Sequence, residues 1–289
     1  MLTDRRNRKL TINAGGRLVD LSRPRVMGIL NVTPDSFYNN SRCGDRATVA
    51  ARVATLLGEG ADMIDVGGYS SRPGCAEVSV DEEKRRLAMG LEAIRLQAPD
   101  AIVSVDTFRA DVARWCVEQW GVQIINDISG GELDTCMYET IADLQVPYVM
   151  MHMRGKPDAM MQEQYLHYED VTADVLQYFA EKIDLLTRMG VNDIIIDPGF
   201  GFSKTIDDNY RLMRHLDEFT RIGLPLLVGI SRKSMIYKLL NTTPAESLNG
   251  TTVLNVLALM GGANILRVHD VKPAVEAVKI VMQTIPDTI

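Results

Sequence analysis

The sequence predicts a single-domain (β/α)8 barrel preceded by a short N-terminal β-hairpin. From residue 25 onward, eight short apolar segments alternate with longer amphipathic segments, and this alternation is typical of a parallel sheet. The 289 residues are enough for such a barrel, which needs roughly 250 residues. The first apolar segment is not followed by a GxGxxG pattern, which disfavours an open dinucleotide-binding sheet.

We expect residues 1–24 to form a hairpin extension and residues 25–289 to form the barrel domain. Alternating residues up to Ile12 and a turn at Gly15-Gly16 predict the hairpin. The predicted barrel strands are 25–32, 62–67, 102–107, 123–128, 148–153, 193–197, 225–231 and 265–269. Helices are expected near 46–59, 80–97, 109–119, 132–143, 169–189, 205–218, 234–240 and 271–283, with an additional helix near 245–260.

Composition narrows the class of protein. With 46% hydrophobic and 24% charged residues, the chain resembles an ordinary globular protein, and its net charge of -7 argues against a nucleic-acid partner. The charged N-terminus and the absence of a long apolar run predict neither a signal peptide nor a membrane span. The four cysteines lack metal-ligand spacing, which predicts no zinc site and favours a reducing cytoplasm.

Polar side chains stand at the C-terminal ends of the predicted strands. They are Asn31, Asp65, Asp106, Asn126, His152, Asp197, Ser231 with Lys233, and Arg267 with His269. This end of a (β/α)8 barrel carries the active site. One polar strand end is more often a cap or a loop anchor, but so many together favour a polar ligand bound across the barrel mouth.

The segment 193–204 carries the strongest single signal. A buried apolar strand ends on Asp197, and the following Pro-Gly-Phe-Gly forces the chain to turn. A buried carboxylate is costly unless it is paired, so Asp197 needs either a ligand or a cation. Lys233, after the next strand, is close enough to form a purely structural salt bridge, and this alternative stays open.

Two loops have the composition of anion sites. Residues 67–74 offer backbone N–H groups, two hydroxyls and the Arg72 guanidinium, and residues 229–234 lead into a helix N-terminus. Arg267 and His269 alternate on the last strand, so both side chains point the same way and suit a phosphate. His152 is interpreted as a pocket-wall residue, and no Ser/His/Asp nucleophile arrangement is required.

The same segments resemble the motifs of the dihydropteroate synthase family. Residues 28–37 and 67–74 resemble its two loop signatures, and residues 104–107, 125–128, 197–202, 231–234 and 267–269 resemble its remaining motifs, in order. The resemblance implies a (β/α)8 barrel that is usually a homodimer and uses Mg2+. It also implies a transferase that joins 6-hydroxymethyl-7,8-dihydropterin diphosphate to p-aminobenzoate in folate synthesis. Loss of diphosphate would precede attack by the arylamine, without a covalent nucleophile.

The resemblance also implies a role for each matching residue. The pterin would be held by Asp106, Asn126, Asp197 and Lys233. The diphosphate would be held by Asn31, Ser71, Arg267 and His269, and the metal by Asn31. The p-aminobenzoate would be contacted by Ser71, Pro73, Phe202 and Ser234. The catalytic groups would be Asp35, Arg72, Lys233 and Arg267.

Two stretches depart from the family pattern. Tyr69 and Ser71 stand where the second loop usually has glutamate and threonine, and residues 38–41 read Tyr-Asn-Asn-Ser instead of Ser-Asp-Gly-Gly. These changes leave the pterin residues intact and bear on the affinity for p-aminobenzoate and sulfonamides.

Two other functions remain open. One is a pterin-binding methyltransferase that serves a corrinoid protein, although its chemistry has no diphosphate for residues 231–234 to hold. The other is a catalytically silent pterin-binding paralogue, which the retained polar residues argue against: Asn31, Asp35, Arg72, Lys233, Arg267 and His269.

Overall fold

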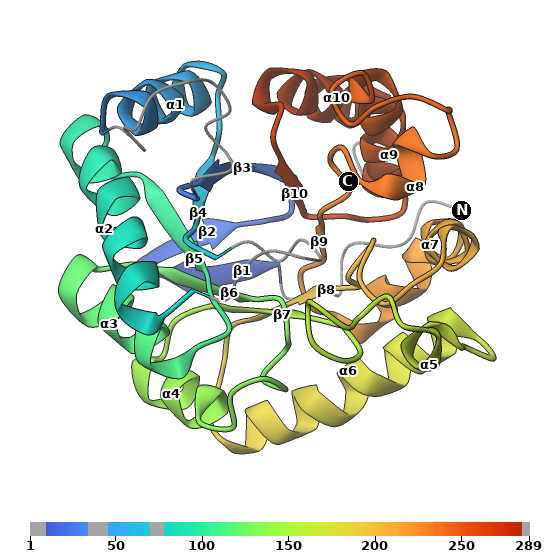
Figure 1. Ribbon diagram of the computed structural model, residues 1–289, viewed down its shortest axis with the longest axis horizontal. Helices are drawn as coiled ribbons and strands as arrows, with labels where there is room; N and C mark the ends of the chain where they lie inside the picture. The colour runs from blue at the N-terminus through green and yellow to red at the C-terminus, as the bar shows by residue number, and fades with distance from the viewer. Residues whose placement is uncertain (1–9, 34–45, 70–77, 285–289) are drawn as a thin grey trace.

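A computed structural model of the protein describes residues 10–33, 46–69 and 78–284 and confirms the predicted barrel with its N-terminal hairpin (Figure 1). In the described residues, the barrel strands follow the order β8-β7-β6-β5-β4-β3-β10-β9, and every neighbouring pair is parallel. An isolated bridge between Ile196 and Leu226 joins the two ends of the sheet. The strands are β3 Arg25–Asn31, β4 Met63–Gly67, β5 Ile102–Asp106, β6 Ile124–Asp127, β7 Tyr148–Met151, β8 Ile194–Asp197, β9 Leu227–Val228 and β10 Ile265–Val268.

Helices surround the sheet, as Figure 1 shows. Those on the first half of the ring are α1 Arg46–Gly58, α2 Val80–Gln97, α3 Ala110–Trp120 and α4 Met137–Leu144. The second half carries α5 Glu163–Leu166, α6 Val171–Arg188, α7 Ile206–Arg214, the 3-10 helix η3 Leu216–Ile222, α8 Ser234–Tyr237, α9 Leu248–Met260 and α10 Val271–Thr284.

Three details of the predicted elements are wrong. The predicted helix 205–218 ends at Arg214, and the chain continues as the 3-10 helix η3. In a 3-10 helix, side chains three residues apart lie on the same side. Leu216 and Phe219 are therefore both buried in the core. The predicted strand 225–231 pairs over only two residues, because Pro225 has no N–H for the ladder and a turn closes from Lys233 N–H to the Ile230 carbonyl. The short helix α5 was not predicted.

The N-terminal hairpin closes one end of the barrel. Strand β1, Thr11–Ala14, pairs antiparallel with β2, Arg17–Asp20. Its apolar side chains, which include Ile12 and Leu21, pack in one cluster with the first residues of the barrel strands. Asn264 connects the two parts, since its amide donates to the Leu21 carbonyl at 2.9 Å and accepts from the Leu226 N–H at 3.0 Å. The C-terminal strand ends therefore lie at the end of the barrel away from this floor.

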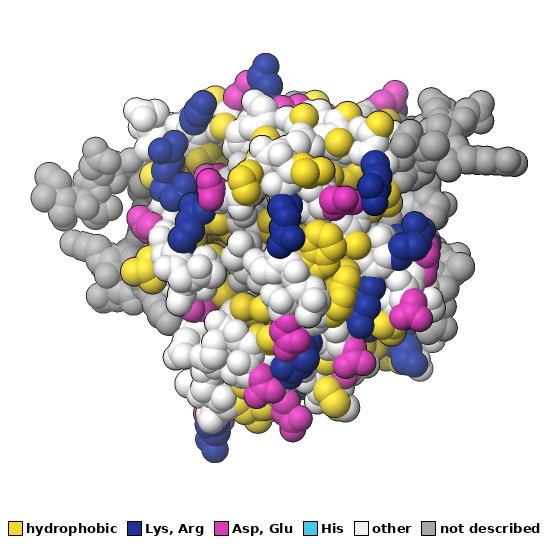
Figure 2. Space-filling model, turned by 90° about the vertical axis from the view of Figure 1, so that its left-hand side faces the viewer, with side chains coloured by type: hydrophobic (Ala, Val, Ile, Leu, Met, Phe, Trp, Pro, Cys, Tyr) yellow, Lys and Arg dark blue, Asp and Glu magenta, His cyan; other side chains and the backbone are white. Residues whose placement is uncertain are grey.

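The outer face over α1, α2 and α3 carries side chains of both charge signs among apolar ones (Figure 2). Arg46 pairs with Glu92 at 3.1 Å and Arg114 with Glu118 at 3.5 Å. Exposed pairs of this kind contribute little stability, so the fold depends on the core. In the three described ranges, no helix combines the length and apolarity needed to cross a membrane.

Replacing Ile12 by alanine should destabilise the fold, because the side chain is 1% exposed and seals the barrel floor. We expect a loss of about 2–5 kcal/mol in the free energy of unfolding, measured by urea denaturation. The control is Leu18→Ala on the same hairpin, where the side chain is 80% exposed and the change should stay within about 0.5 kcal/mol. Equal losses in both variants would contradict a structural role for the floor.

Candidate functional site

Most of the predicted site residues gather at the C-terminal strand ends. Asn31 ends β3, Asp106 ends β5, Asp197 ends β8, and Asn126 and Arg267 lie within β6 and β10. The loops that follow β9 and β10 supply Lys233 and His269, and Ser234 is the first residue of α8. Four predicted residues lie outside the described residues: Asp35, Ser71, Arg72 and Pro73.

Arg267 is the centre of a buried polar network. Its Nε donates to Asp65 Oδ2 at 2.7 Å and its Nη2 to Asp106 Oδ2 at 2.6 Å. The Asn126 amide donates to the same Asp65 oxygen at 3.1 Å. Asp65 is fully buried, and its Oδ1 accepts no hydrogen bond from the described part of the chain. The network thus joins four strands, β4, β5, β6 and β10. Asp65 was predicted as a polar residue at a strand end, without a role. A buried carboxylate at such a position needs a cation or a hydrogen-bond donor as its partner.

The network keeps Arg267 charged. Burial opposes ionisation of the guanidinium, but the carboxylates of Asp65 and Asp106 outweigh it and raise the pKa of Arg267 above its ordinary value. Burial raises the pKa of Asp106 to about 7, against the lowering effect of Arg267. Asp106 can therefore gain or lose a proton near neutral pH, while the arginine stays cationic.

Asp197 presents an oxygen to the barrel mouth. The side chain is 5% exposed, and among the described residues only the Gly199 N–H donates to it, at 2.8 Å to Oδ1. Burial raises the pKa of Asp197, and the nearby charge of Lys233 opposes this rise. The second carboxylate oxygen, Oδ2, accepts no hydrogen bond from the described residues.

Lys233 does not form the salt bridge with Asp197 that the sequence left open. Its ammonium donates to the Phe200 carbonyl and lies 4.5 Å from the centre of the Phe202 ring, an attractive cation–π geometry. Burial lowers the pKa of Lys233 to about 8, although Asp197 opposes this shift. Lys233 and Phe202 therefore form one wall of the site.

Lys204 is a site residue that sequence reasoning missed. It is 2% exposed, and its ammonium contacts His152 Nδ1 at 2.9 Å and three carbonyls, those of His152, Gly199 and Phe202, at 3.0–3.3 Å. Burial lowers the pKa of Lys204 to about 7. The sequence signal was a lysine three residues after Gly201, because a glycine turn leaves backbone carbonyls in need of donors. His152 is a buried wall residue, as expected.

Asn31 supplies a hard oxygen close to the network. A Cβ built on Gly67 would lie 3.4 Å from Asn31 Oδ1 and 3.7 Å from Asp106 Cβ, so this glycine keeps the space between the two side chains open. The described residues contain no cluster of three or more His, Cys, Asp or Glu that could hold a metal. Mg2+ often takes only one or two protein oxygens together with substrate phosphates and waters, and a single amide oxygen fits that mode.

Tyr69, the departure from the family pattern, packs as an aromatic residue. Its ring lies 5.0 Å from that of Phe108 in an edge-to-face arrangement, and the Arg109 guanidinium lies 5.5 Å from it. Arg109 is itself held by Glu83 at 2.7 Å. The position that carries an acid in the family is therefore built into an aromatic and guanidinium stack here.

Comparisons with known proteins agree with this arrangement. The family described as pterin binding enzyme matches residues 27–269 of the chain. Dihydropteroate synthase of Escherichia coli (strain K12) is 44% identical over 274 residues, which cover 94% of this chain and 95% of that protein.

Solved structures share the fold. A Yersinia pestis dihydropteroate synthase in a sulfonamide drug complex superposes with a TM-score of 0.88 at 41% identity, over 95% of this chain and 98% of that one. A Xanthomonas albilineans dihydropteroate synthase with 4-aminobenzoic acid gives a TM-score of 0.87 at 38% identity, over 96% and 99%. These matches define a pterin-binding barrel enzyme. Within that class, the chain belongs to the dihydropteroate synthase family.

Replacing Arg267 by alanine should lower the free energy of unfolding by about 3–5 kcal/mol, because it leaves two buried carboxylates without their cation. The loss should be larger at about pH 8 than at about pH 5. Without Arg267 the folded-state pKa of Asp106 rises further above its ordinary 3.8, so folded stability falls as pH rises through that window.

Denaturant titrations at both pH values measure this effect. Arg188→Ala is the matched control, since its partner Asp184 lies at 2.9 Å in a pair that is 76% and 62% exposed. That variant should change stability by about 0.5 kcal/mol or less at either pH. A pH-independent loss in Arg267→Ala would rule out carboxylate repulsion as the cause.

Proposed function

We propose that this chain condenses 6-hydroxymethyl-7,8-dihydropterin diphosphate with p-aminobenzoate to give 7,8-dihydropteroate and diphosphate. One observation supports this most: a charged arginine and two hydrogen-bonding groups, Asn126 and the open oxygen of Asp197, face the same end of one barrel. A flat heterocycle that carries a diphosphate needs this combination. The likeness to dihydropteroate synthases over nearly the whole chain supports the same reaction.

The pterin binds through Asp197, Asn126, Asp106 and Lys233. A carboxylate can accept two parallel N–H bonds from an aminopyrimidinone edge, as it does from a guanidinium. In Asp197 the open oxygen takes the ligand, while Gly199 holds the other oxygen in place. Lys233 approaches the ring from the wall that it forms with Phe202.

The diphosphate binds beside the pterin at Arg267, His269, Asn31 and Ser71. Because Arg267 contacts Asp106 directly, the phosphate and pterin subsites adjoin. Mg2+ would be held by Asn31 together with the diphosphate and would supply positive charge to the leaving group. Arg267 is fixed before the substrate arrives, so it stabilises the developing charge without rearranging.

The reaction proceeds by loss of diphosphate first. The bond between the pterin methylene carbon and the diphosphate oxygen breaks, its electron pair leaves with the diphosphate, and a pterin-methyl cation remains. The amino nitrogen of p-aminobenzoate attacks this carbon and then loses a proton. Lys233 and Arg267 act as catalytic groups together with Asp35 and Arg72 from the loops after β3 and β4. Excluding water protects the cation from capture.

The p-aminobenzoate binds against Phe202 and Ser234, with Ser71 and Pro73 completing the subsite. Phe202 is held by the ammonium of Lys233 and by the contact of Lys204 with its carbonyl. The Xanthomonas albilineans relative binds 4-aminobenzoic acid and the Yersinia pestis relative a sulfonamide. Both ligands are therefore candidates for this subsite.

A turnover assay with both substrates and Mg2+ tests the function, with release of pyrophosphate as the readout. Asp197→Asn should weaken pterin binding by about 2–5 kcal/mol in calorimetry, the range for disrupting a buried charged hydrogen bond. Asp184→Asn, an exposed carboxylate, is the control and should behave as wild type. Tight pterin binding without pyrophosphate release would favour the silent paralogue, and binding of methyltetrahydrofolate without turnover would favour the methyltransferase.

The chain forms a homodimer through α9. This helix exposes Val253, Leu257 and Met260, and it borders a groove of about 500 Å³ that is also lined by α7 and η3. Burying such a surface against a second copy is favourable. Sedimentation equilibrium should show a dimer that Leu257→Asp converts to monomer. Leu96→Asp on α2, where Leu96 is 79% exposed, should leave the dimer intact. A dimer that survives Leu257→Asp would place the interface elsewhere.

The barrel domain spans residues 25–289, and the hairpin extension spans residues 1–24. The packing of the hairpin against the barrel floor supports this division. The enzyme works in the cytoplasm. The described cysteines, Cys116 and Cys136, are both free thiols, which suits a reducing compartment.

A further inference from the structure

Ser231 makes two contacts with one residue, His269. The Ser231 hydroxyl accepts a hydrogen bond from the His269 backbone N–H at 3.2 Å and lies 3.1 Å from the ring nitrogen Nδ1. A serine hydroxyl has a single proton to donate. In the described part of the chain, Nδ1 is the one acceptor within hydrogen-bond distance of this hydroxyl. The proton of Ser231 therefore points to Nδ1.

We infer that Ser231 is a positioning residue that fixes the imidazole of His269 as the tautomer with its proton on Nε2. A nitrogen that accepts a hydrogen bond carries no proton, so the single ring proton resides on the other nitrogen. His269 then presents a neutral N–H donor with a fixed ring orientation. This use of the donor for the diphosphate rests on the function proposed above.

The surroundings keep the ring neutral. Burial lowers the pKa of His269 to about 4, and the charge of Arg267 acts in the same direction. Asp270 opposes the shift, while Arg232 and Arg52 add to it. The ring therefore carries one proton at neutral pH, and its position is decided by Ser231. A neutral donor adds a hydrogen bond without adding charge next to Arg267.

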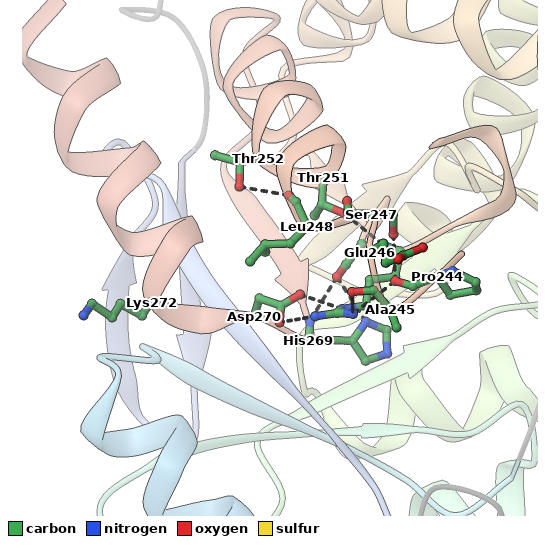
Figure 3. A network of polar contacts seen from close by, with 12 residues as sticks. Pro244, Ala245, Glu246, Ser247, Leu248, Thr251, Thr252, His269, Asp270 and Lys272 are labelled. Carbon is green, nitrogen blue, oxygen red and sulfur yellow. Dashed lines mark hydrogen bonds and ion pairs between the residues drawn. The ribbon is translucent and has the colours of Figure 1, made fainter. Parts of the chain in front are cut away.

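Hydrogen bonds of the neighbouring residue hold the backbone around Ser231 in place. Its neighbour Arg232 has φ of 56°, a left-handed conformation that few residues other than glycine adopt. The Arg232 guanidinium donates to both oxygens of Asp270 at 2.8 Å. Figure 3 labels Asp270 together with Pro244 and Ala245, which are further partners of this guanidinium. The same guanidinium donates to the carbonyls of Pro244 and Ala245 at 3.0 and 2.9 Å.

His269 is held from its other side as well. Arg52 on α1 donates to the His269 carbonyl at 2.5 Å, and the Arg232 N–H bonds Thr251 Oγ1 at 3.1 Å. Both the serine and the histidine thus have fixed backbones. The distances between the serine and the histidine are therefore set by the surrounding scaffold.

Nitrogen-15 NMR of the histidine rings tests the inference directly. In wild type near neutral pH, we expect His269 to show a protonated Nε2 and an unprotonated Nδ1 through its couplings to the ring protons. His269→Gln assigns the signals by removing them. Ser231→Ala should produce a mixture of tautomers, and Ser231→Thr, which keeps the hydroxyl, should restore one. A protonated Nδ1 in wild type, or an unchanged tautomer in Ser231→Ala, would overturn the inference.

The same spectrum contains an internal control. His215 Nδ1 lies 3.1 Å from Glu218 Oε1, and an ionised carboxylate only accepts, so that nitrogen must be protonated. His215 should therefore show a protonated Nδ1, unlike His269. The wild-type measurement does not need Ser231→Ala, so it decides the tautomer even if that variant folds poorly.

Titration with inorganic pyrophosphate and Mg2+ separates this inference from the proposed function. We expect the Nε2 signal of His269 to shift, and Ser231→Ala to weaken pyrophosphate binding by roughly 2- to 10-fold, the effect of one neutral hydrogen bond. The KM for the pterin diphosphate should rise while that for p-aminobenzoate stays constant. The expected tautomer without any response to pyrophosphate would overturn the diphosphate contact of His269 and leave the role of Ser231 in place.

Discussion

The pairing of Arg267 with Asp65 and Asp106 is the interaction on which the rest of the site depends. A guanidinium at the end of a buried strand loses its hydration, and that cost is offset only by close carboxylates with good geometry. The same Asp65 oxygen holds the amide of Asn126. A single buried carboxylate therefore positions both Arg267 and Asn126, the residues that we propose as the cation for the leaving group and a donor for the heterocycle.

The loops after β8 and β9 show a second constraint, a backbone held in the left-handed region. Gly199 and Gly201 have φ of 73° and 78°, and Ser203 and Arg232 adopt φ of 46° and 56° without being glycine. In the loop after β8, the buried Lys204 donates to the carbonyls of Gly199 and Phe202. In the loop after β9, the partly exposed Arg232 guanidinium donates to the Pro244 carbonyl, on the segment between α8 and α9. Such strain is found where the surrounding structure determines it fully, as at binding sites.

Much of this structure was accessible from the sequence, for physical reasons. The barrel followed from the alternation of segments, and Asp106, Asn126, Asp197 and Arg267 followed from the cost of polar groups at buried strand ends. Lys204 did not, because its burial depends on carbonyls from two different strands. The contact between Ser231 and His269 was not predicted either. It requires that β9 and β10 be neighbours and that their relative register be known. The packing of Tyr69 on Phe108 was also not predicted. It depends on how the segment before α3 approaches the residues after β4, which local sequence patterns do not specify.

The hairpin under the barrel limits how ligands can enter and leave. With the floor filled by Ile12, Leu21 and the first residues of the strands, the barrel is shaped as a cup and not as a tunnel. Asn126 and Asp197 are 3% and 5% exposed, and Phe202 beside them is partly exposed. With the floor closed, the substrates that we propose and their coupled product would share the open rim as their way in and out.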